Sequence, residues 1–156
     1  MNVTYRRATI EDIEILAELR IKFLAEHFNP AGESEYDALK KELRKYFTEN
    51  IPSGALIAWL AASDRKVVAT AGMVVWRIPA NNSMKNGKLG YILNMYTLPE
   101  ARGQGICTAL LEKLIDDAKS LGLNLVHLHA SKMGEPIYRK RGFREPGDVE
   151  LVLRID

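Results

Sequence analysis

Hydrophobic residues recur along the chain with two different periods, which divide it into helices and strands. The alternation over Val3–Ala8 predicts a first strand. Thr9 then predicts a helix cap, because Asp12 stands three residues later where a capping carboxylate would lie. Helical spacing follows at Ile13, Leu16, Ala17, Leu19, Arg20, Phe23 and Leu24. The turn-forming residues 29–32 end this first helix.

A second helix is predicted from Ser34, which is a residue that commonly caps a helix start. Its apolar side carries Tyr36, Leu39, Leu43, Tyr46 and Phe47. The Pro-Ser-Gly sequence of residues 52–54 ends the helical part of the chain.

The rest of the chain alternates between apolar runs and helical patterns. Strands are predicted over residues 55–62, 67–78, 88–97, 123–130 and 149–155. The first two of these form a hairpin across a short polar turn. Helices are predicted from Ile106 to Gly122 and over Glu135–Arg141, where Gly142 is a natural stop. The order predicts an α/β (α+β) fold with an antiparallel front half and a strand–helix–strand unit at the back.

Composition and charge exclude several classes of protein. The 156 residues are 47% hydrophobic and 27% charged, which is typical of one folded domain, and we expect a single domain over 1–156. The net charge of +2 is too small to indicate a nucleic-acid partner. The N-terminus lacks the apolar core of a signal peptide, and no apolar run is long enough to cross a membrane. Cys107 is the one cysteine, so we expect no disulfide and a cytoplasmic protein.

A glycine-containing turn, Arg102-Gly103-Gln104-Gly105-Ile106, follows one predicted strand and opens one predicted helix. A helix start carries unpaired backbone N–H groups and a partial positive charge, and glycines let a phosphate approach them. The turn is neither a G-x-x-x-x-G-K-[ST] loop nor a G-x-G-x-x-G fingerprint. It therefore predicts a phosphate site of another type.

A second motif, one strand and one helix downstream, narrows this interpretation. Tyr138 stands four residues before Gly142-Phe143, and Pro99 stands three residues before Arg102. Together the two motifs resemble those of the GCN5-related N-acetyltransferase (GNAT) superfamily, whose patterns are Arg/Gln-x-x-Gly-x-Gly/Ala and Tyr-x-x-x-Gly-Phe. The order of predicted strands is similar to that superfamily over nearly the whole chain.

The resemblance implies a mixed, mostly antiparallel central sheet with a splayed parallel strand pair, flanked by about four helices. It also implies that acetyl-CoA lies where the strands ending at Thr97 and Ala130 separate, and that no metal is required. The implied cofactor-binding residues are Met95, Tyr96, Thr97, Arg102, Gly103, Gln104, Gly105, Ile106, Cys107, Thr108 and Ser131. Two of them depart from the family pattern: Cys107 replaces Gly or Ala, and Ser131 replaces a frequent Asn.

The resemblance implies that Tyr138 is the general acid, since a phenol can donate a proton to the leaving thiolate. A tyrosine that merely packs on the sheet is the structural alternative. The general base is less defined, because the strand before the turn offers Asn94 and no carboxylate. Glu26, His27 or a water held by Asn94 are the candidates.

Other reactive residues have structural interpretations beside functional ones. His127 and His129 have a spacing that can bind a metal, but no third ligand is visible in the sequence. Cys107 is a small packed residue or a thiol whose pKa the helix start lowers. The basic residues 139–141 form a solvated helix face or lie near the anionic end of CoA.

The acceptor is the least determined part of the prediction. By the resemblance, Glu26–Glu35 and the loop Pro79–Gly87 flank its pocket, and Trp59, Trp76 and Tyr91 are large enough to line it. We expect acetyl transfer to a primary amine of a small molecule. A protein or peptide amine, a non-catalytic acyl-CoA-binding module and an unrelated nucleotide-binding domain are the alternatives. A homodimer is an expectation from the resemblance alone.

Overall fold

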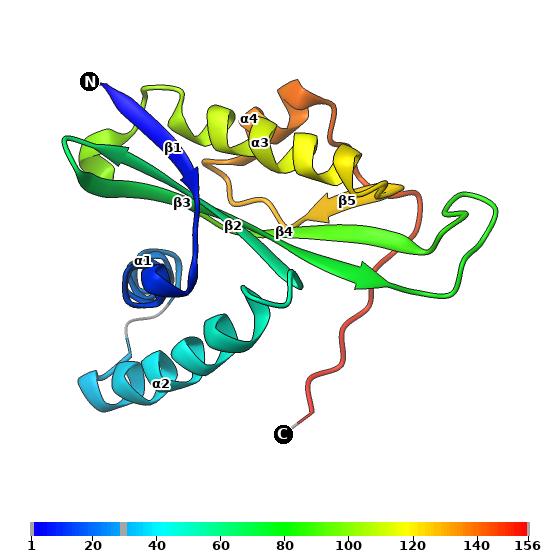
Figure 1. The fold of residues 1–156 in the computed structure, drawn as a ribbon. Coiled ribbons are helices and arrows are strands. Elements are labelled where there is room, and N and C mark those ends of the chain that lie inside the picture. The colour runs from blue at the N-terminus through cyan, green and yellow to red at the C-terminus, as the bar shows by residue number, and fades with distance from the viewer. Residues whose placement is uncertain (1, 29–30, 156) are drawn as a thin grey trace.

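A five-stranded mixed sheet forms the centre of the protein in a computed structural model that describes residues 2–28 and 31–155 (Figure 1). The strands are β1 (Val3–Arg7), β2 (Leu56–Ser63), β3 (Lys66–Arg77), β4 (Lys88–Thr97) and β5 (Leu125–Leu128). They lie in the order β1-β2-β3-β4-β5. The first four are mutually antiparallel, and β5 runs parallel to β4. The predicted mixed sheet with one parallel pair is confirmed.

One predicted strand is wrong. Residues 149–155 form no strand, although their alternating apolar pattern is typical of one. The side chains of Val149, Leu151, Val152, Leu153 and Ile155 are 79–87% exposed. A strand needs a neighbouring backbone to satisfy its N–H and C=O groups, and no described segment lies beside this one as a pairing partner. Figure 1 shows the C-terminal segment running away from the sheet.

Helices cover both faces of the sheet. They are η1 (Ile10–Asp12), α1 (Ile13–His27), α2 (Glu33–Asn50), η2 (Pro99–Ala101), α3 (Ile106–Ser120) and α4 (Glu135–Arg141), with η denoting 3₁₀ turns. In Figure 1, α3 and α4 lie above the sheet, and α1 and α2 lie below it. The four predicted α-helices are therefore present, and α4 has its predicted bounds.

The helix starts test the predicted caps. The Thr9 side chain accepts a hydrogen bond from Glu11 N, and the Asp12 carboxylate accepts one from Thr9 N at 2.8 Å, so the first predicted cap is confirmed. The Ser34 prediction is wrong, because α2 begins at Glu33 and the Gly32 N–H donates to the Glu35 carboxylate at 3.0 Å. Glu35 thus supplies the carboxylate half of a capping box, and no side-chain hydroxyl caps the helix. The first helix is predicted to end at residues 29–32, of which residues 29 and 30 lie outside the described residues.

The core is divided by the sheet into two layers. The larger layer contains Leu110, Leu111 and Leu114 of α3 packed against the sheet, together with Met73 and Ile92. The smaller layer packs α1 and α2 on β2 through Leu16, Ala17, Phe47, Leu56 and Leu60. Burial of these side chains removes apolar surface from water, which is the main force that holds the helices on the sheet.

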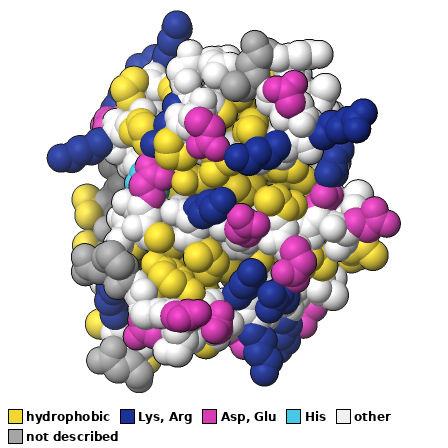
Figure 2. All heavy atoms as spheres, turned by 90° about the vertical axis from the view of Figure 1, so that its left-hand side faces the viewer, with side chains coloured by type: hydrophobic (Ala, Val, Ile, Leu, Met, Phe, Trp, Pro, Cys, Tyr) yellow, Lys and Arg dark blue, Asp and Glu magenta, His cyan; other side chains and the backbone are white. Residues whose placement is uncertain are grey.

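The surface mixes charges of both signs. Figure 2 shows hydrophobic side chains near the centre of one face, with Lys, Arg, Asp and Glu side chains interspersed around them. Among the described residues, no helix combines the length and the apolar character that crossing a bilayer requires.

Candidate active site

A bulge in β4 creates the centre of the site. Thr70 of β3 pairs with Tyr96, whereas Gly72 pairs with Leu93, so Ala71 alone faces two residues of β4, Asn94 and Met95. Asn94 accordingly has a positive φ of 57°, which is uncommon for a residue other than glycine. A bulge bends a strand and turns its side chains. The bulge at Asn94 therefore turns β4 at the place where the strands are expected to separate.

The parallel strands β4 and β5 separate just before this bulge. Their register runs from Leu89–Leu125 to Ile92–Leu128 and stops there. Among the described residues, β4 beyond Ile92 has a partner only on its β3 side. The backbone of Met95, Tyr96 and Thr97 therefore borders an opening between the two strands.

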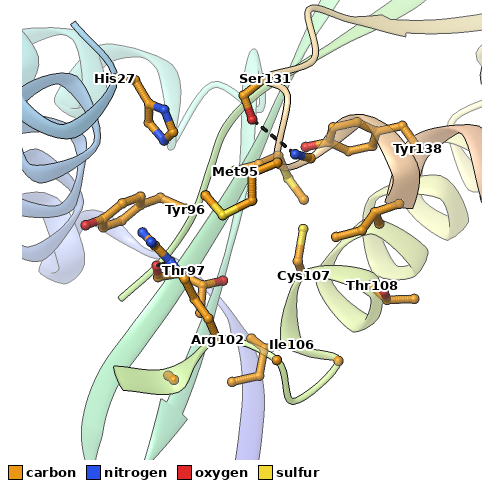
Figure 3. A pocket seen from close by; sticks show the side chains of 16 residues that line it. His27, Met95, Tyr96, Thr97, Arg102, Ile106, Cys107, Thr108, Ser131 and Tyr138 are labelled. Atoms are coloured by element: carbon orange, nitrogen blue, oxygen red, sulfur yellow. Dashed lines mark hydrogen bonds between the residues drawn. The ribbon is translucent and has the colours of Figure 1, made fainter. Parts of the chain in front are cut away.

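A cavity of about 370 Å³ fills this opening, and we call it the glycine-turn cavity (Figure 3). Its lining residues are His27, Met95, Tyr96, Thr97, Ala101, Arg102, Gly103, Gly105, Ile106, Cys107, Thr108, Ser131, Met133, Gly134, Ile137 and Tyr138. The structure thus brings together eleven of the twelve predicted cofactor-binding and catalytic residues. Gln104 is the predicted residue that does not line the cavity.

The glycine turn leaves most of its backbone N–H groups without an acceptor, although the Arg102 N–H donates to the Pro99 carbonyl oxygen. Gly103 and Gly105 both have a positive φ, 76° and 75°, which glycine adopts without steric cost. Within the described chain, the N–H groups of residues 103–105 donate to no backbone or side-chain acceptor. α3 starts at Ile106, and no acidic residue lies in its first turn. The first turn of α3 also carries free N–H groups and a partial positive charge. This edge of the cavity therefore attracts anions.

Arg102 is held by neighbours on the cavity wall. Its Nε donates to the Thr97 carbonyl oxygen at 2.9 Å, and its Nη2 forms an ion pair with Glu26 at 2.7 Å. The Tyr96 hydroxyl donates to the same carboxylate at 3.0 Å. Partial burial raises the pKa of Glu26, but the hydrogen bonds from Arg102 and Tyr96 outweigh it and hold that pKa below its ordinary value. Glu26 is therefore an ion-pair partner rather than a proton acceptor near neutral pH.

Tyr138 lies at the inner end of the cavity and is buried. It comes from the middle of α4, and Figure 3 shows its hydroxyl end turned toward Ser131 and Met95. Burial, and to a smaller extent the Cys107 thiol, raise the pKa of Tyr138 well above its ordinary value. The phenol therefore stays protonated and can donate a hydrogen bond or a proton.

Two predicted residues have more specific surroundings than expected. Burial raises the pKa of the Cys107 thiol, which favours the small packed residue over the alternative of a thiol whose pKa the helix start lowers. The Ser131 Oγ accepts a hydrogen bond from Gly134 N–H at 3.2 Å, which orders the turn before α4. The Ser131 hydroxyl proton remains available to the cavity.

A second cavity of about 450 Å³ lies beside the first, between α1 and the separated strands. We call it the α1 cavity. The residues shared by both cavities are His27, Met95, Ser131 and Tyr138. Of the predicted base candidates, His27 borders both cavities and Asn94 borders the α1 cavity. Glu26 borders neither.

The sequence profile of the Acetyltransferase (GNAT) family matches residues 15–143, which is most of the chain and spans both motifs. The chain belongs to the GNAT acetyltransferase family. A comparison with curated protein sequences found no match.

Solved structures agree with this assignment. The GNAT chain is 33% identical to a predicted acetyltransferase from Clostridium acetobutylicum crystallised with acetyl-CoA, with a TM-score of 0.89 and coverage of 97% and 96% of the two chains. It shares its fold with a GCN5-related N-acetyltransferase from Ralstonia eutropha JMP134 (24% identity, TM-score 0.84, coverage 97% and 99%). The same fold occurs in glucosamine-6-phosphate N-acetyltransferase from Arabidopsis thaliana (20% identity, TM-score 0.69, coverage 100% of both chains).

The histidines considered as metal ligands and the basic residues 139–141 do not line the glycine-turn cavity. His127 packs against Trp76 and Tyr91, and throughout residues 2–28 and 31–155 no three His, Cys, Asp or Glu side chains gather as metal ligands would. Arg139 pairs with Glu135 and Glu145, and Arg141 pairs with Glu112. These basic side chains are thus neutralised by their own neighbours.

Only some of the residues predicted to flank the acceptor line one of the two cavities. Phe28 and Tyr91 line the α1 cavity, whereas residues 79–87 line neither cavity. Trp59 points elsewhere and donates through Nε1 to Asp117 at 2.7 Å.

Sequence reasoning also passed over Gly134 and Arg20, which line the glycine-turn cavity and the α1 cavity respectively. The signal for Arg20 was its position within the apolar stripe of α1.

Proposed function

We propose that this GNAT chain transfers an acetyl group from acetyl-CoA directly to a primary amine of a small molecule, with Tyr138 as the general acid. The observation that carries the proposal is the junction of the two cavities at Met95, Ser131 and Tyr138. One cavity suits the donor, because its outer edge offers the unpaired N–H groups of the glycine turn to a pyrophosphate. The other reaches the same tyrosine from the side of α1 and suits the acceptor.

The expected chemistry follows from this junction. The amine nitrogen attacks the thioester carbonyl carbon, the C–S bond breaks, and the sulfur leaves as a thiolate. Tyr138, whose phenol stays protonated because burial raises its pKa, donates a hydrogen bond to that thiolate or gives it the phenol proton, and solvent then returns a proton to the tyrosine. The amine gives up a proton to a base. His27 is the best placed of the three predicted candidates, because it borders both cavities.

The backbone of Met95, Tyr96 and Thr97 is proposed to pair with the acetyl and pantetheine part of the donor. This proposal is supported by the absence of a β5 partner for that stretch among the described residues. Residues 102–108 are proposed to hold the pyrophosphate through backbone N–H groups, with the Arg102 guanidinium committed to Glu26 and Thr97. Gln104 contributes at most its backbone. We further propose that residues 1–156 form one N-acetyltransferase domain, since one sheet carries all five strands.

Replacement of Tyr138 by Phe tests the proposal. We expect kcat to fall about 100-fold or more, the usual contribution of a general acid, while acetyl-CoA still binds. Release of CoA thiol with a panel of amines at saturating acetyl-CoA measures the rate, and calorimetry measures binding. Tyr5→Phe is the matched control, because Tyr5 lines neither cavity. Full activity of Tyr138→Phe would refute the acid role, and failure of the wild type to bind acetyl-CoA would refute the proposed function.

A further inference from the structure

The α1 cavity continues into a third cavity of about 380 Å³, which lies between α2 and the sheet. We call it the aromatic cavity, because Tyr46, Phe47, Trp76 and Tyr91 line it. Trp76 and Tyr91 stack with their ring centroids 5.4 Å apart and their planes 9° from parallel. Arg20 lines both the α1 cavity and the aromatic cavity. An arginine therefore stands where the space next to Tyr138 opens into an apolar chamber.

Arg20 differs from the other partly buried arginines in having no carboxylate partner. Three arginines of the described chain are partly buried: Arg20, Arg44 and Arg102. Arg44 pairs with Glu14 at 2.7 Å, and Arg102 pairs with Glu26 at 2.7 Å. Within the described residues, Arg20 forms neither an ion pair nor a hydrogen bond, and its guanidinium carbon lies 5.4 Å from the centroid of the Phe23 ring. A half-buried cation without a counter-ion is costly unless something else supplies the negative charge.

The surroundings of Arg20 offer no such charge. Neither the α1 cavity nor the aromatic cavity is lined by a single Asp or Glu. Glu18 and Glu14 on the same helix are already paired with Lys22 and Arg44. Burial lowers the pKa of Arg20, and the groups that oppose this effect are the phenols of Tyr91 and Tyr46 rather than carboxylates. The guanidinium nevertheless remains charged at neutral pH.

Asn94 adds hydrogen-bonding capacity beside Arg20. It lines both the α1 cavity and the aromatic cavity, and its side chain sits at the β4 bulge. Asn94 is 8% exposed, and its Oδ1 has no hydrogen-bond partner among the described residues. A buried amide oxygen without a donor is rare, and an N–H group of a bound ligand is one way to satisfy it.

We propose that the acceptor is a primary amine that also carries a carboxylate, which Arg20 binds, and an apolar body, which enters the aromatic cavity. The inference rests on the proposed acetyl transfer and names the class of acceptor. One planar guanidinium matches one carboxylate in a two-pronged hydrogen bond. An α-amino acid with an apolar side chain is the simplest molecule of this class. A polyamine or a lysine-rich peptide would meet Arg20 without any acidic residue to offset the repulsion.

A panel of matched amines tests the acceptor class. Each amino carboxylate, such as leucine, phenylalanine, 4-aminobutyrate or 6-aminohexanoate, is compared with its own neutral amide. Spermidine is included as a polycationic amine without a carboxylate, and glucosamine 6-phosphate as an amine that carries a phosphate. We expect at least one carboxylate to exceed its amide and spermidine in kcat/KM by about 10-fold or more, the effect of one charge-assisted hydrogen bond. If kcat/KM for the amides, for spermidine or for glucosamine 6-phosphate equals or exceeds that for every carboxylate, the inference is overturned.

Substitutions then test whether Arg20 is responsible. Arg20→Gln is expected to lower kcat/KM for the preferred carboxylate about 10- to 100-fold and to leave that for its amide unchanged. Arg20→Lys is expected to restore part of the preference for the carboxylate over its amide, since lysine keeps the positive charge but lacks the two-pronged guanidinium geometry. Arg44→Gln is the control, because it removes an arginine that lies on the neighbouring helix and is only partly exposed but lines neither cavity. If Arg20→Gln lowered kcat/KM equally for the carboxylate and for its amide, the assignment of Arg20 to carboxylate binding would be contradicted.

The same assays separate this inference from the proposed function. Acetyl-CoA binding is measured by calorimetry for the wild type and for each variant. If acetyl-CoA binds but no carboxylate amine is acetylated, the inference fails while donor binding stands. If acetyl-CoA does not bind at all, the proposed function itself fails.

Discussion

At the residue scale, the donor side of the site depends on a small network of charges. The sequence pattern treats Arg102 as a phosphate ligand and Glu26 as a candidate base, and it offers no reason to connect them. In the structure they form an ion pair, which the Tyr96 hydroxyl joins. Both side chains are about 30% exposed, 29% for Arg102 and 32% for Glu26, so the pair is screened only in part. Its role is to fix the start of the glycine turn against α1.

Glu26→Gln tests this role through the pH dependence of stability. The folded-state pKa of Glu26 is lowered, so its stabilising contribution is present above its unfolded pKa and is lost as the pH falls through the folded value. We expect the variant to be about 1 kcal/mol less stable at neutral pH. The difference should shrink below about pH 4.5, where the wild-type carboxyl also becomes neutral. Thermal unfolding of both proteins as a function of pH measures it.

Glu18→Gln serves as the control for Glu26→Gln. Glu18 also pairs with a basic residue, Lys22, but its side chain is 50% exposed. Its removal should change stability little at any pH. A stability difference for Glu26→Gln that stays constant from neutral to acidic pH would contradict the charge-based explanation.

At the element scale, α4 positions Tyr138, the proposed general acid. The helix has seven residues, and Gly142 follows it with a φ of 107°, as the Gly-Phe ending of the motif predicts. Gly134 precedes it and packs directly under the Tyr138 ring. A Cβ added at Gly134 would lie 2.9 Å from Tyr138 Cε2 and 3.5 Å from the hydroxyl oxygen. The missing side chain therefore provides the space in which the phenol is placed.

Gly134→Ala should shift Tyr138 without removing it. Because a small misplacement of a reacting group is costly, we expect kcat to fall about 10- to 100-fold, with a smaller change in acetyl-CoA affinity. Steady-state kinetics and calorimetry measure the two effects. Gly147→Ala is the control, since a Cβ there meets nothing within 4 Å. Wild-type kcat in Gly134→Ala would show that the Tyr138 position is not limiting.

At the scale of the whole molecule, the sheet ends in an open strand. β5 has a neighbour only on its β4 side among the described residues, and the apolar segment 149–155 is exposed. Open edges and exposed apolar segments favour pairing with another chain. These two features support the expectation of a homodimer, which stays a prediction.

Removal of residues 149–156 tests the expected dimer. If the exposed segment of one copy covers the β5 edge of another, the wild type should be a dimer by light scattering and the shortened chain a monomer. Acetyl-CoA binding should survive, since none of the removed residues lines the glycine-turn cavity. A monomeric wild type, or a shortened chain that still dimerises, would contradict the expectation. Substitution of Leu151 and Leu153 by Thr is a milder variant that keeps the chain length.

Local chemistry alone was sufficient for much of the fold. The bounds of β4 and α4, the Thr9–Asp12 cap and the glycines at the turn follow from periodicity and backbone preferences, which act over a few residues. The same is true of the two motifs, because each lies within one short stretch of chain. The sequence thus determined the family, the donor-side turn and the candidate acid Tyr138.

Only the tertiary structure decided what depends on partners distant in sequence. Whether residues 149–155 form a strand depends on a neighbouring backbone rather than on their own apolar pattern. The bulge at Asn94 depends on the register with β3, and the Glu26–Arg102 pair joins residues 76 positions apart. The isolated charge of Arg20 is visible only when every carboxylate near it has been placed. The sequence therefore predicted the residues of the proposed donor site, whereas the proposed acceptor side depends on which side chains the fold leaves without partners.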